Sequence, residues 1–218
     1  MFELADSNAS SINFLAIANA LQSQGYAIIP HALPVDIETS LIKHAVQLSE
    51  KQMKQAAIGR NQNETTNKFV RQDKIVWIKE GSAAEKAWLA QMSLLREQLN
   101  RQLFLGLFSY ESHFACYPEG AFYKKHLDAF KGQANRILST VYYLNPNWQP
   151  EDGGELVIYD PADNNKILTQ VSPQAGTMVV FLSEEFPHEV LAAKRTRYSI
   201  AGWFRLNTSV KGQIDPPK

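Results

Sequence analysis

The stretch Tyr117-Pro-Glu-Gly-Ala-Phe-Tyr-Lys-Lys-His126-Leu-Asp128 carries two potential metal ligands two residues apart. Successive side chains of an extended strand point to opposite faces, so His126 and Asp128 would share a face and could hold one ion from adjacent directions. Any exposed strand can carry a His-x-Asp pair, so this motif is weak by itself. It predicts a metal-binding strand if a third ligand lies elsewhere in the chain.

The remote segment Pro187-His188-Glu189-Val190 offers a third ligand. Two histidines and one carboxylate on one face of an octahedral ion are typical of non-haem Fe(II) oxygenases, and the other positions stay open for cosubstrate and O₂. Arg197 follows His188 at an interval that fits a strand, a turn and a returning strand. Its guanidinium could bind a carboxylate through two hydrogen bonds. We therefore expect His126, Asp128 and His188 to bind iron and Arg197 to anchor an acidic cosubstrate.

Composition indicates an ordinary folded chain. It has 218 residues, 44% of them hydrophobic, with 22 basic and 22 acidic side chains and one cysteine, Cys116. This suits one globular domain, and zero net charge gives no general attraction to nucleic acid or anionic membranes. A single cysteine excludes an internal disulfide and fits a reducing compartment. Because we find neither a secretory signal nor a membrane span, we expect a cytoplasmic protein without nucleic-acid or membrane partners.

The first half of the chain has helical patterns. Apolar residues recur at helical spacing in residues 10–24, and Gly25 follows where a left-handed cap would end the helix. A second helix is expected after Pro34. Ser82 and Glu85 form a capping-box pattern ahead of a long amphipathic helix, in which the serine oxygen would accept a backbone N–H and the glutamate would reach back to the serine N–H. We expect this long helix to lie across the outside of a sheet.

Residues 57–68 are polar and lack periodicity, and strand character returns from Phe69 to Ile78. This pattern predicts a mobile flap at about 57–75 beside the site.

Short strands separated by turn residues dominate the second half. They are expected at 110–117, 122–127, 137–143, 155–159, 167–171, 177–182, 188–191 and 197–205, after an earlier strand at 26–29. Many short strands at this spacing predict a sandwich or jelly roll. We thus expect a single domain over 1–218, with helical support at 1–105, a core at 106–207 and a tail at 208–218.

Seven motifs follow one another between about residues 69 and 206: Val70-Arg-Gln-Asp-Lys-Ile-Val-Trp77, Ala115-Cys-Tyr-Pro118, His126-Leu-Asp128, Val141-Tyr-Tyr-Leu-Asn145, Gly153-Gly-Glu-Leu156, Pro187-His-Glu-Val190 and Arg197-Tyr-Ser-Ile200. With them the sequence resembles the Fe(II)/2-oxoglutarate dioxygenases, and among these the prolyl hydroxylases of the hypoxia-inducible-factor type and their bacterial relatives. The resemblance implies a mainly β fold, a double-stranded β-helix (jelly-roll, cupin-like) core packed against N-terminal α-helices.

The resemblance also implies cofactors and an activity. Fe(II), 2-oxoglutarate and O₂ would serve the reaction, with ascorbate as a further candidate. The implied reaction converts a peptidyl proline to 4-hydroxyproline with release of succinate and CO₂. A proline-containing protein would be the substrate, with translation components as candidates.

Residue roles follow from strand parity and from the resemblance together. Val141 and Tyr143 would face the barrel interior while Tyr142 packs outward, so Tyr143 could donate its phenol to the carboxylate that Arg197 holds. Tyr117 is expected at the cosubstrate or substrate.

The substrate side is assigned to Arg71, Asp73, Arg136, Trp77 and Trp203, with Ile75 and Leu156 as further pocket walls. Asp73 and Arg136 occupy two positions that carry opposite charges in the family pattern, so the resemblance implies that Asp73 pairs with Arg136 and ties the flap to the barrel rim. Arg71 would then face the incoming polypeptide. His113, on the strand before Tyr117, is expected to be a packing residue.

Alternatives remain open. The same chemistry could act on a small molecule or a nucleic acid, and a barrel without redox activity could hold a metal as a sensor.

Overall fold

The computed structural model describes residues 13–48, 53–55, 70–129 and 135–207. The helices are α1 (Phe14–Gln24), α2 (Val35–Gln47), α3 (Ala83–Leu103) and the short 3₁₀ turn η2 (Pro150–Asp152). The strands are β1 (Tyr26–Ile29), β2 (Lys54–Gln55), β3 (Lys74–Trp77), β4 (Leu107–Tyr117), β5 (Tyr123–His126), β6 (Arg136–Tyr143), β7 (Leu156–Tyr159), β8 (Ile167–Val171), β9 (Met178–Leu182), β10 (His188–Val190) and β11 (Arg197–Leu206).

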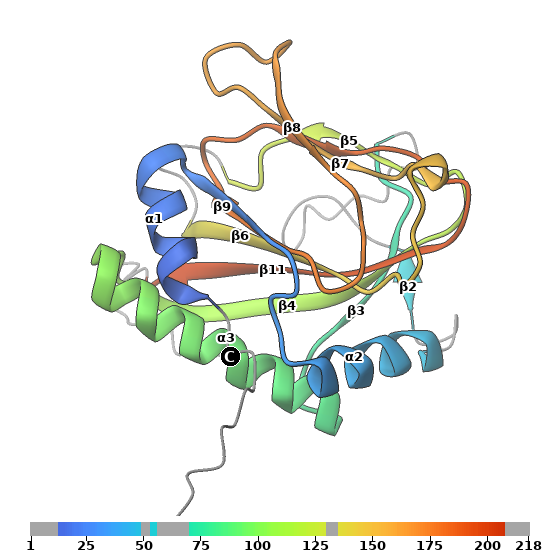
Figure 1. The fold of residues 1–218 in the computed structure, drawn as a ribbon, viewed down its shortest axis with the longest axis horizontal. Coiled ribbons are helices and arrows are strands. Elements are labelled where there is room, and N and C mark those ends of the chain that lie inside the picture. The colour runs from blue at the N-terminus through green and yellow to red at the C-terminus, as the bar shows by residue number, and fades with distance from the viewer. Residues whose placement is uncertain (1–12, 49–52, 56–69, 130–134, 208–218) are drawn as a thin grey trace, which may run out of the picture.

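Two antiparallel sheets form the centre of the molecule. The larger one has seven strands in the order β1-β9-β6-β11-β4-β3-β2, and the smaller has four in the order β5-β10-β7-β8. Figure 1 shows the helices against one face of the large sheet, with the small sheet across its other face. This is the mainly β architecture with flanking helices that the sequence predicts.

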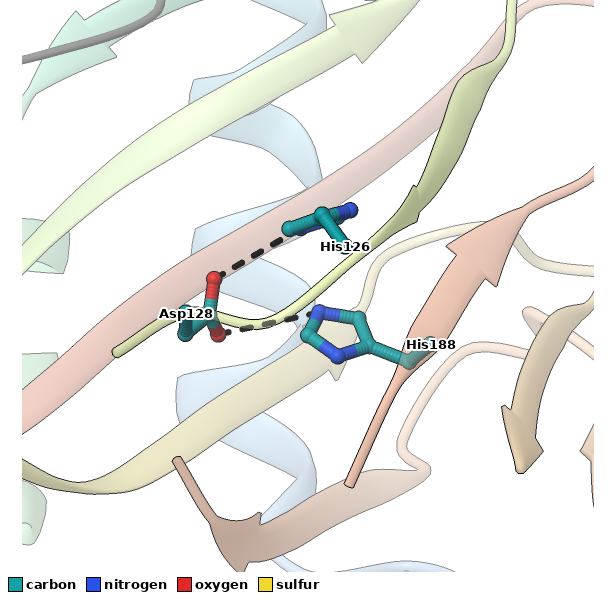
Figure 2. Close-up of side chains that lie close together, drawn as sticks. All are labelled: His126, Asp128 and His188. Carbon is teal, nitrogen blue, oxygen red and sulfur yellow. Dashed lines mark ion pairs between the residues drawn. The ribbon is translucent and has the colours of Figure 1, made fainter. Parts of the chain in front are cut away.

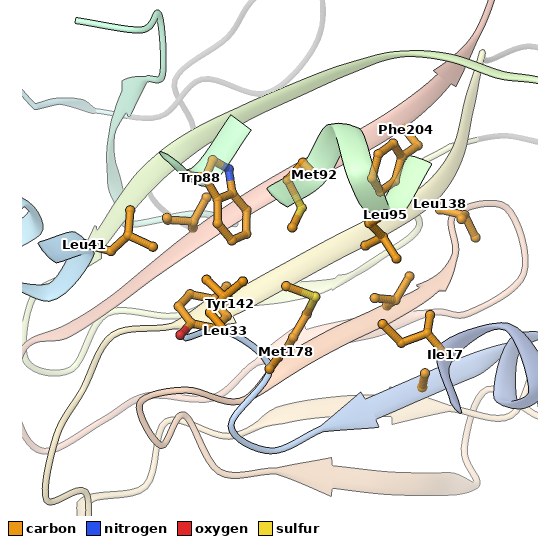
Figure 3. Close-up of a cluster of buried hydrophobic side chains, with 14 of the residues drawn as sticks. Ile17, Leu33, Leu41, Trp88, Met92, Leu95, Leu138, Tyr142, Met178 and Phe204 are labelled. Atoms are coloured by element: carbon orange, nitrogen blue, oxygen red, sulfur yellow. The ribbon is translucent and has the colours of Figure 1, made fainter. Parts of the chain in front are cut away.

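One hydrophobic core lies between the helices and the large sheet. The buried stripe of α3, with Trp88, Met92 and Leu95, meets residues of the large sheet that point outward, among them Tyr142 and Phe204 (Figure 3). Burial of such side chains contributes roughly 1.5–3 kcal/mol each. The helical half of the chain therefore covers the large sheet and leaves its other face for the site.

A second core lies between the two sheets. It contains residues of the large sheet that point inward, such as Tyr143 and Val179, and residues of the small sheet such as Leu156 and Ile158. Tyr142 belongs to the outer core and Tyr143 to the inner one, so the parity predicted for β6 is confirmed.

Local signals explain the helix ends. The N–H of Gly25, at φ 79°, donates to the carbonyl of Leu21 and ends α1 as predicted. At the start of α3, Ser82 Oγ accepts the N–H of Glu85 at 3.1 Å, which confirms half of the capping box. The other half is wrong. Glu85 Oε2 accepts the N–H groups of Lys79 and Gly81 instead, because the positive φ of Glu80 curls the chain so that both reach it.

Most of the predicted flap and the tail lie outside the described residues. At the end of the flap range, β3 pairs with β4, with Ile75 opposite Ala115, so Lys74 and Ile75 belong to the large sheet.

Candidate active site

Antiparallel pairing brings the three predicted metal ligands together. His126 ends β5, His188 begins β10, and the two are directly opposite in the register of these strands. Asp128 lies in a bend two residues beyond β5, so the expectation that both ligands share one strand is wrong. His126 Nε2 lies 3.6 Å from Asp128 Oδ1, and His188 Nε2 lies 3.7 Å from Asp128 Oδ2. Figure 2 shows both rings turned toward the carboxylate. One ligand atom from each residue fits within 4.8 Å of the others, a spacing that one ion could bridge.

Backbone carbonyls select the ring nitrogen that faces the carboxylate. His126 Nδ1 lies 2.7 Å from the Lys124 carbonyl, and His188 Nδ1 lies 3.0 Å from the Phe186 carbonyl. A carbonyl can only accept, so each Nδ1 must carry the proton and each Nε2 has a free lone pair. Both rings are thereby held in the tautomer that binds a metal through Nε2.

A serine orients the carboxylate. Ser139 Oγ donates to Asp128 Oδ2 at 2.6 Å and lies 2.9 Å from Ser183 Oγ. Burial raises the pKa of Asp128, but the positive charge that His188 carries in acid, the hydrogen bond and acid-state charge of His126 and the Ser139 hydroxyl outweigh it and hold that pKa well below its usual range. Asp128 is therefore an anion at neutral pH, as a ligand of a divalent cation must be.

Burial acts in the opposite direction on His188. Desolvation, followed by the charge of His126, lowers the pKa of His188 to about 4. The ring packs edge-on against Phe181 at a centroid separation of 4.7 Å. His188 is thus neutral at physiological pH, and a metal need not displace a proton from it.

Arg197 and Tyr143 carry buried polar atoms that lack hydrogen-bond partners among the described residues. These atoms are Tyr143 Oη and Arg197 Nε and Nη1. The Arg197 guanidinium lies 5.1 Å from the Tyr143 ring centroid and 4.9 Å from that of Tyr117. Buried donors without an acceptor are costly. Two of these three donors belong to the Arg197 cation, and the third is the phenol of Tyr143. Together they fit the distal carboxylate of a dicarboxylic acid.

Apolar side chains pack in one cluster with Tyr117 and Tyr143. They come from both sheets and include Leu156, Ile158, Val179, Phe181 and Val190. Tyr143 and Ser139 are four residues apart on β6, about 13 Å along the strand. One arginine side chain and a five-carbon dicarboxylate together could bridge this separation and reach the metal ligands.

Comparison with known proteins agrees with this geometry. The family model described as the 2OG-Fe(II) oxygenase superfamily matches residues 112–205. The crystal structure of a Pseudomonas putida prolyl-4-hydroxylase is 40% identical, with a TM-score of 0.80, covering 88% of this chain and 98% of that one. The chain belongs to the 2OG-Fe(II) oxygenase superfamily. This family uses Fe(II), 2-oxoglutarate and O₂, and its members have a double-stranded β-helix fold.

A prolyl hydroxylase and a protein named Egl nine homolog 1 are two further relatives of this oxygenase. The structure of a Trichoplax adhaerens prolyl hydroxylase with a peptide fragment of the hypoxia inducible factor oxygen degradation domain is 27% identical, with a TM-score of 0.78 and 88% of both chains covered. Human Egl nine homolog 1 is 30% identical over 152 residues, 66% of this chain and 35% of that protein. The chain spans about a third to under half of the length of the first curated relatives it matches.

Trp77, His113 and Trp203 form an aromatic group in the large sheet of this oxygenase. Trp203 is opposite Ser139 in the register of β11 and β6, which places it beside the Asp128 support. Trp77 and Trp203 both contact the buried ring of His113, at centroid separations of 5.2 and 5.6 Å. His113 is a packing residue, as predicted, and Trp77 is 44% exposed. Trp203 is 8% exposed, so Trp77 provides most of the exposed aromatic surface of this group.

The predicted latch between Asp73 and Arg136 is wrong. Asp73 accepts hydrogen bonds from Nε and Nη2 of Arg71, two residues earlier in the segment before β3, at 2.5 and 2.8 Å. Arg136 pairs with Glu111 at 2.8 Å, and its guanidinium stacks on Trp203 at 3.7 Å. Asp73 pairs within its own segment, and Arg136 of β6 pairs with Glu111 of β4. Opposite charges at two positions do not specify a pair when other charges compete, and the sequence gives no strand order.

Sequence reasoning missed several residues at the site. Ser139, which supports Asp128, and Tyr123, whose ring stacks on His126 at 3.6 Å, were not assigned a role. Tyr123 precedes His126 by only three residues, so its position in the sequence could have indicated a contact with this ligand. Ser139 gave none, because its contact with Asp128 depends on how β6 passes β5.

No helix in the described part of the chain is long and apolar enough to cross a membrane.

Proposed function

We propose that this oxygenase is a protein prolyl 4-hydroxylase. The observation that carries the proposal is the presence, in one chain, of a His-Asp-His cluster and of buried Tyr143 and Arg197 atoms that lack partners among the described residues. A barrel that only sensed a metal would have no need for a buried guanidinium and phenol without partners. Support for proline as the target comes from the relatives that are prolyl hydroxylases, in particular the Pseudomonas putida structure.

His126, Asp128 and His188 would hold Fe(II) through the two Nε2 atoms and the carboxylate. Bound iron supplies the activation of O₂, with 2-oxoglutarate as the source of electrons. One oxygen atom of O₂ ends in succinate and the other in the hydroxyl group at C4 of proline, while the 1-carboxyl group leaves as CO₂. The protein's own task is to set the positions of the reactants.

Arg197 and Tyr143 would bind the distal carboxylate of 2-oxoglutarate. Two guanidinium N–H groups and one phenol O–H would then all be satisfied by two carboxylate oxygens. Burial raises the pKa of Tyr143, although the charge of Arg197 opposes this, so the phenol keeps its proton and can donate. Tyr117 would form the wall beside this carboxylate.

The apolar walls would exclude water from the reacting centre. A strong oxidant that meets water or polar side chains reacts with them instead of with the substrate. Exclusion of water therefore keeps cosubstrate turnover coupled to substrate oxidation. Trp77, which is 44% exposed and packs against Trp203, would offer an apolar surface to the pyrrolidine ring of a peptidyl proline. Arg71 and Arg136 flank this surface.

The test uses anaerobically purified full-length protein loaded with Fe(II). With 2-oxoglutarate, O₂ and a library of proline-containing peptides, we expect succinate to form and some peptides to gain the mass of one oxygen atom on proline. Components of the translation machinery are the first protein substrates to try. Succinate without any modified peptide, alongside oxidation of a small molecule or a nucleic acid, would contradict proline as the target.

We further propose that residues 1–218 act as one domain, since the helices of the first half pack on the large sheet. Ascorbate would keep the metal reduced. The single cysteine fits a reducing compartment, and we propose the cytoplasm.

A further inference from the structure

The segment before β3 pairs with the metal-binding strand. Arg71 forms an antiparallel bridge with Tyr123, the N–H of Gln72 donates to the Phe122 carbonyl at 3.1 Å, and the N–H of Lys124 donates to the Val70 carbonyl at 2.9 Å. The carbonyl of Lys124 in turn accepts from His126 Nδ1. Residues 70–73 therefore support the backbone that sets the tautomer of a metal ligand.

A buried ion pair fixes the side chain of Arg71. Asp73 is fully buried, and its two carboxylate oxygens accept from Arg71 Nε and Nη2 at 2.5 and 2.8 Å. Such a two-point contact sets the plane of the guanidinium as well as its position. Its carbon lies 4.8 Å from the centroid of the Tyr123 ring, within the range of a cation–π contact.

The Tyr123 ring lies against a metal ligand. It stacks on the His126 imidazole with a centroid separation of 3.6 Å and an angle of 19° between the planes. The hydrogen bond to Lys124 limits where His126 Nδ1 can lie, but a single hydrogen bond leaves the ring free to tilt. A flat surface in contact with one face of the imidazole removes that freedom.

We propose that Asp73, Arg71 and Tyr123 are positioning residues that hold the imidazole of His126 in the orientation needed to bind the metal. Asp73 orients Arg71, Arg71 holds Tyr123, and Tyr123 holds His126. The inference rests on the proposed iron site, because it gives a role to the orientation of one of its ligands. It replaces the latch to Arg136 with a contact that acts on the metal ligand.

The mechanism has an energetic reason. A ligand that rotates freely must be ordered when the metal binds, and this loss of side-chain entropy weakens binding. Residues that order the ligand in advance raise affinity, and loss of such outer contacts typically lowers metal affinity about 10–100-fold. The contact with Asp73 is indirect, so its removal should cost less than removal of the Tyr123 ring.

The experiment measures Co(II) binding to full-length, metal-free protein by the visible absorption of the bound ion. We expect Tyr123→Leu to weaken Co(II) binding about tenfold, and Arg71→Gln and Asp73→Asn to weaken it several-fold. Tyr123→Phe, which retains the ring, should bind as the unmodified protein does. Asp73→Asn combined with Tyr123→Leu should bind no more weakly than Tyr123→Leu alone, because both changes act through the same ring.

The chain offers a matched control. Asp152 pairs with Arg195 at 3.4 Å, and Arg195 lies over the Trp148 ring at 4.4 Å, so the same three kinds of group occur away from the metal ligands. Asp152→Asn should leave Co(II) affinity unchanged. Thermal unfolding of the metal-free variants shows whether each is folded, and if Asp73→Asn is not, Arg71→Gln and Tyr123→Leu decide.

Normal Co(II) affinity in folded Tyr123→Leu would overturn the proposal, and so would losses that multiply in the double variant. These results are separable from the proposed function. Weakened Co(II) binding in the variants, with no proline peptide hydroxylated by the unmodified protein, would uphold the positioning role and contradict prolyl hydroxylation. Hydroxylated peptides together with unchanged Co(II) affinity in every variant would uphold prolyl hydroxylation and overturn the positioning role.

Discussion

Ser139 Oγ donates a hydrogen bond of 2.6 Å to Oδ2 of Asp128, from a strand of the large sheet to the carboxylate that lies between two histidines. The bond fixes which carboxylate oxygen faces His188 and which faces His126. It joins β6 to the segment after β5, at the point where the proposed iron would bind.

Removing this hydroxyl should weaken the metal site. We expect Ser139→Ala to lower Fe(II) affinity by about tenfold, since outer hydrogen bonds to a metal-binding carboxylate commonly have this effect. Ser112→Ala is the control, because Ser112 is equally buried but bonds Trp88 on the helix side of the sheet. The measurement is Fe(II) activation of succinate formation under anaerobic loading, and equal behaviour of the two variants would contradict a role for Ser139.

Arg197→Lys should raise the KM for 2-oxoglutarate far more than Tyr143→Phe. Loss of a two-point charged contact should cost roughly 2–4 kcal/mol of binding and loss of one phenol hydrogen bond about 1 kcal/mol. Initial rates of succinate formation at varied 2-oxoglutarate give both values. Arg195→Lys is the control, since Arg195 binds the Pro146 carbonyl and Asp152 and has no contact with Tyr143 among those described. An equal effect of that control would show that the anchor is misplaced.

His188→Ala should abolish 2-oxoglutarate turnover while the protein remains folded. The ring supplies one of three metal ligands, and two ligands cannot hold Fe(II) in the required geometry. Circular dichroism and thermal unfolding check the fold. His44→Ala, which removes a histidine bonded to Glu85 beside α3, should retain turnover. Full turnover in His188→Ala would refute the assignment of the three ligands.

Double-mutant cycles should show that Arg136 is coupled energetically to Glu111. We expect about 0.2–1 kcal/mol of coupling between Arg136→Gln and Glu111→Gln in the free energy of unfolding, the usual range for partly exposed pairs. Arg136→Gln and Asp73→Asn should be additive, because they have different partners. Urea unfolding of the metal-free protein gives these energies, and strong coupling to Asp73 would restore the latch that the structure contradicts.

His113 should make stability depend on pH. Burial, followed by the charge of Arg71, lowers its pKa from 6.5 to about 4. Between these two values the unfolded chain binds the proton and the folded chain does not, so stability is present above about pH 6.5 and is lost as the pH falls toward 4. The shift corresponds to about 3 kcal/mol. The free energy of unfolding of metal-free His113→Gln should therefore fall less across this window, and an identical slope would contradict the shift.

The sequence by itself determined the local structure and the identity of the ligands. The alternation along 137–143 separated Tyr142 from Tyr143, Gly25 marked the end of a helix, and the two-residue spacing of His126 and Asp128 identified a chelate. These features depend on backbone periodicity and on side-chain chemistry, which are properties of short stretches. The resemblance to a family extended them to Arg197 and to the choice of cosubstrate.

Only the tertiary structure decided which charges and rings meet. Asp73 binds Arg71, Arg136 binds Glu111, Ser139 reaches Asp128, and Tyr123 covers His126. The physical reason is that opposite charges attract at any sequence separation, and the winning partner is the one that strand order and register place within about 3–4 Å. The same rule applies to Glu85, whose carboxylate bonds Lys79 and Gly81 because the chain curls back there. Sequence patterns name the candidates for each contact, and packing of the two sheets selects among them.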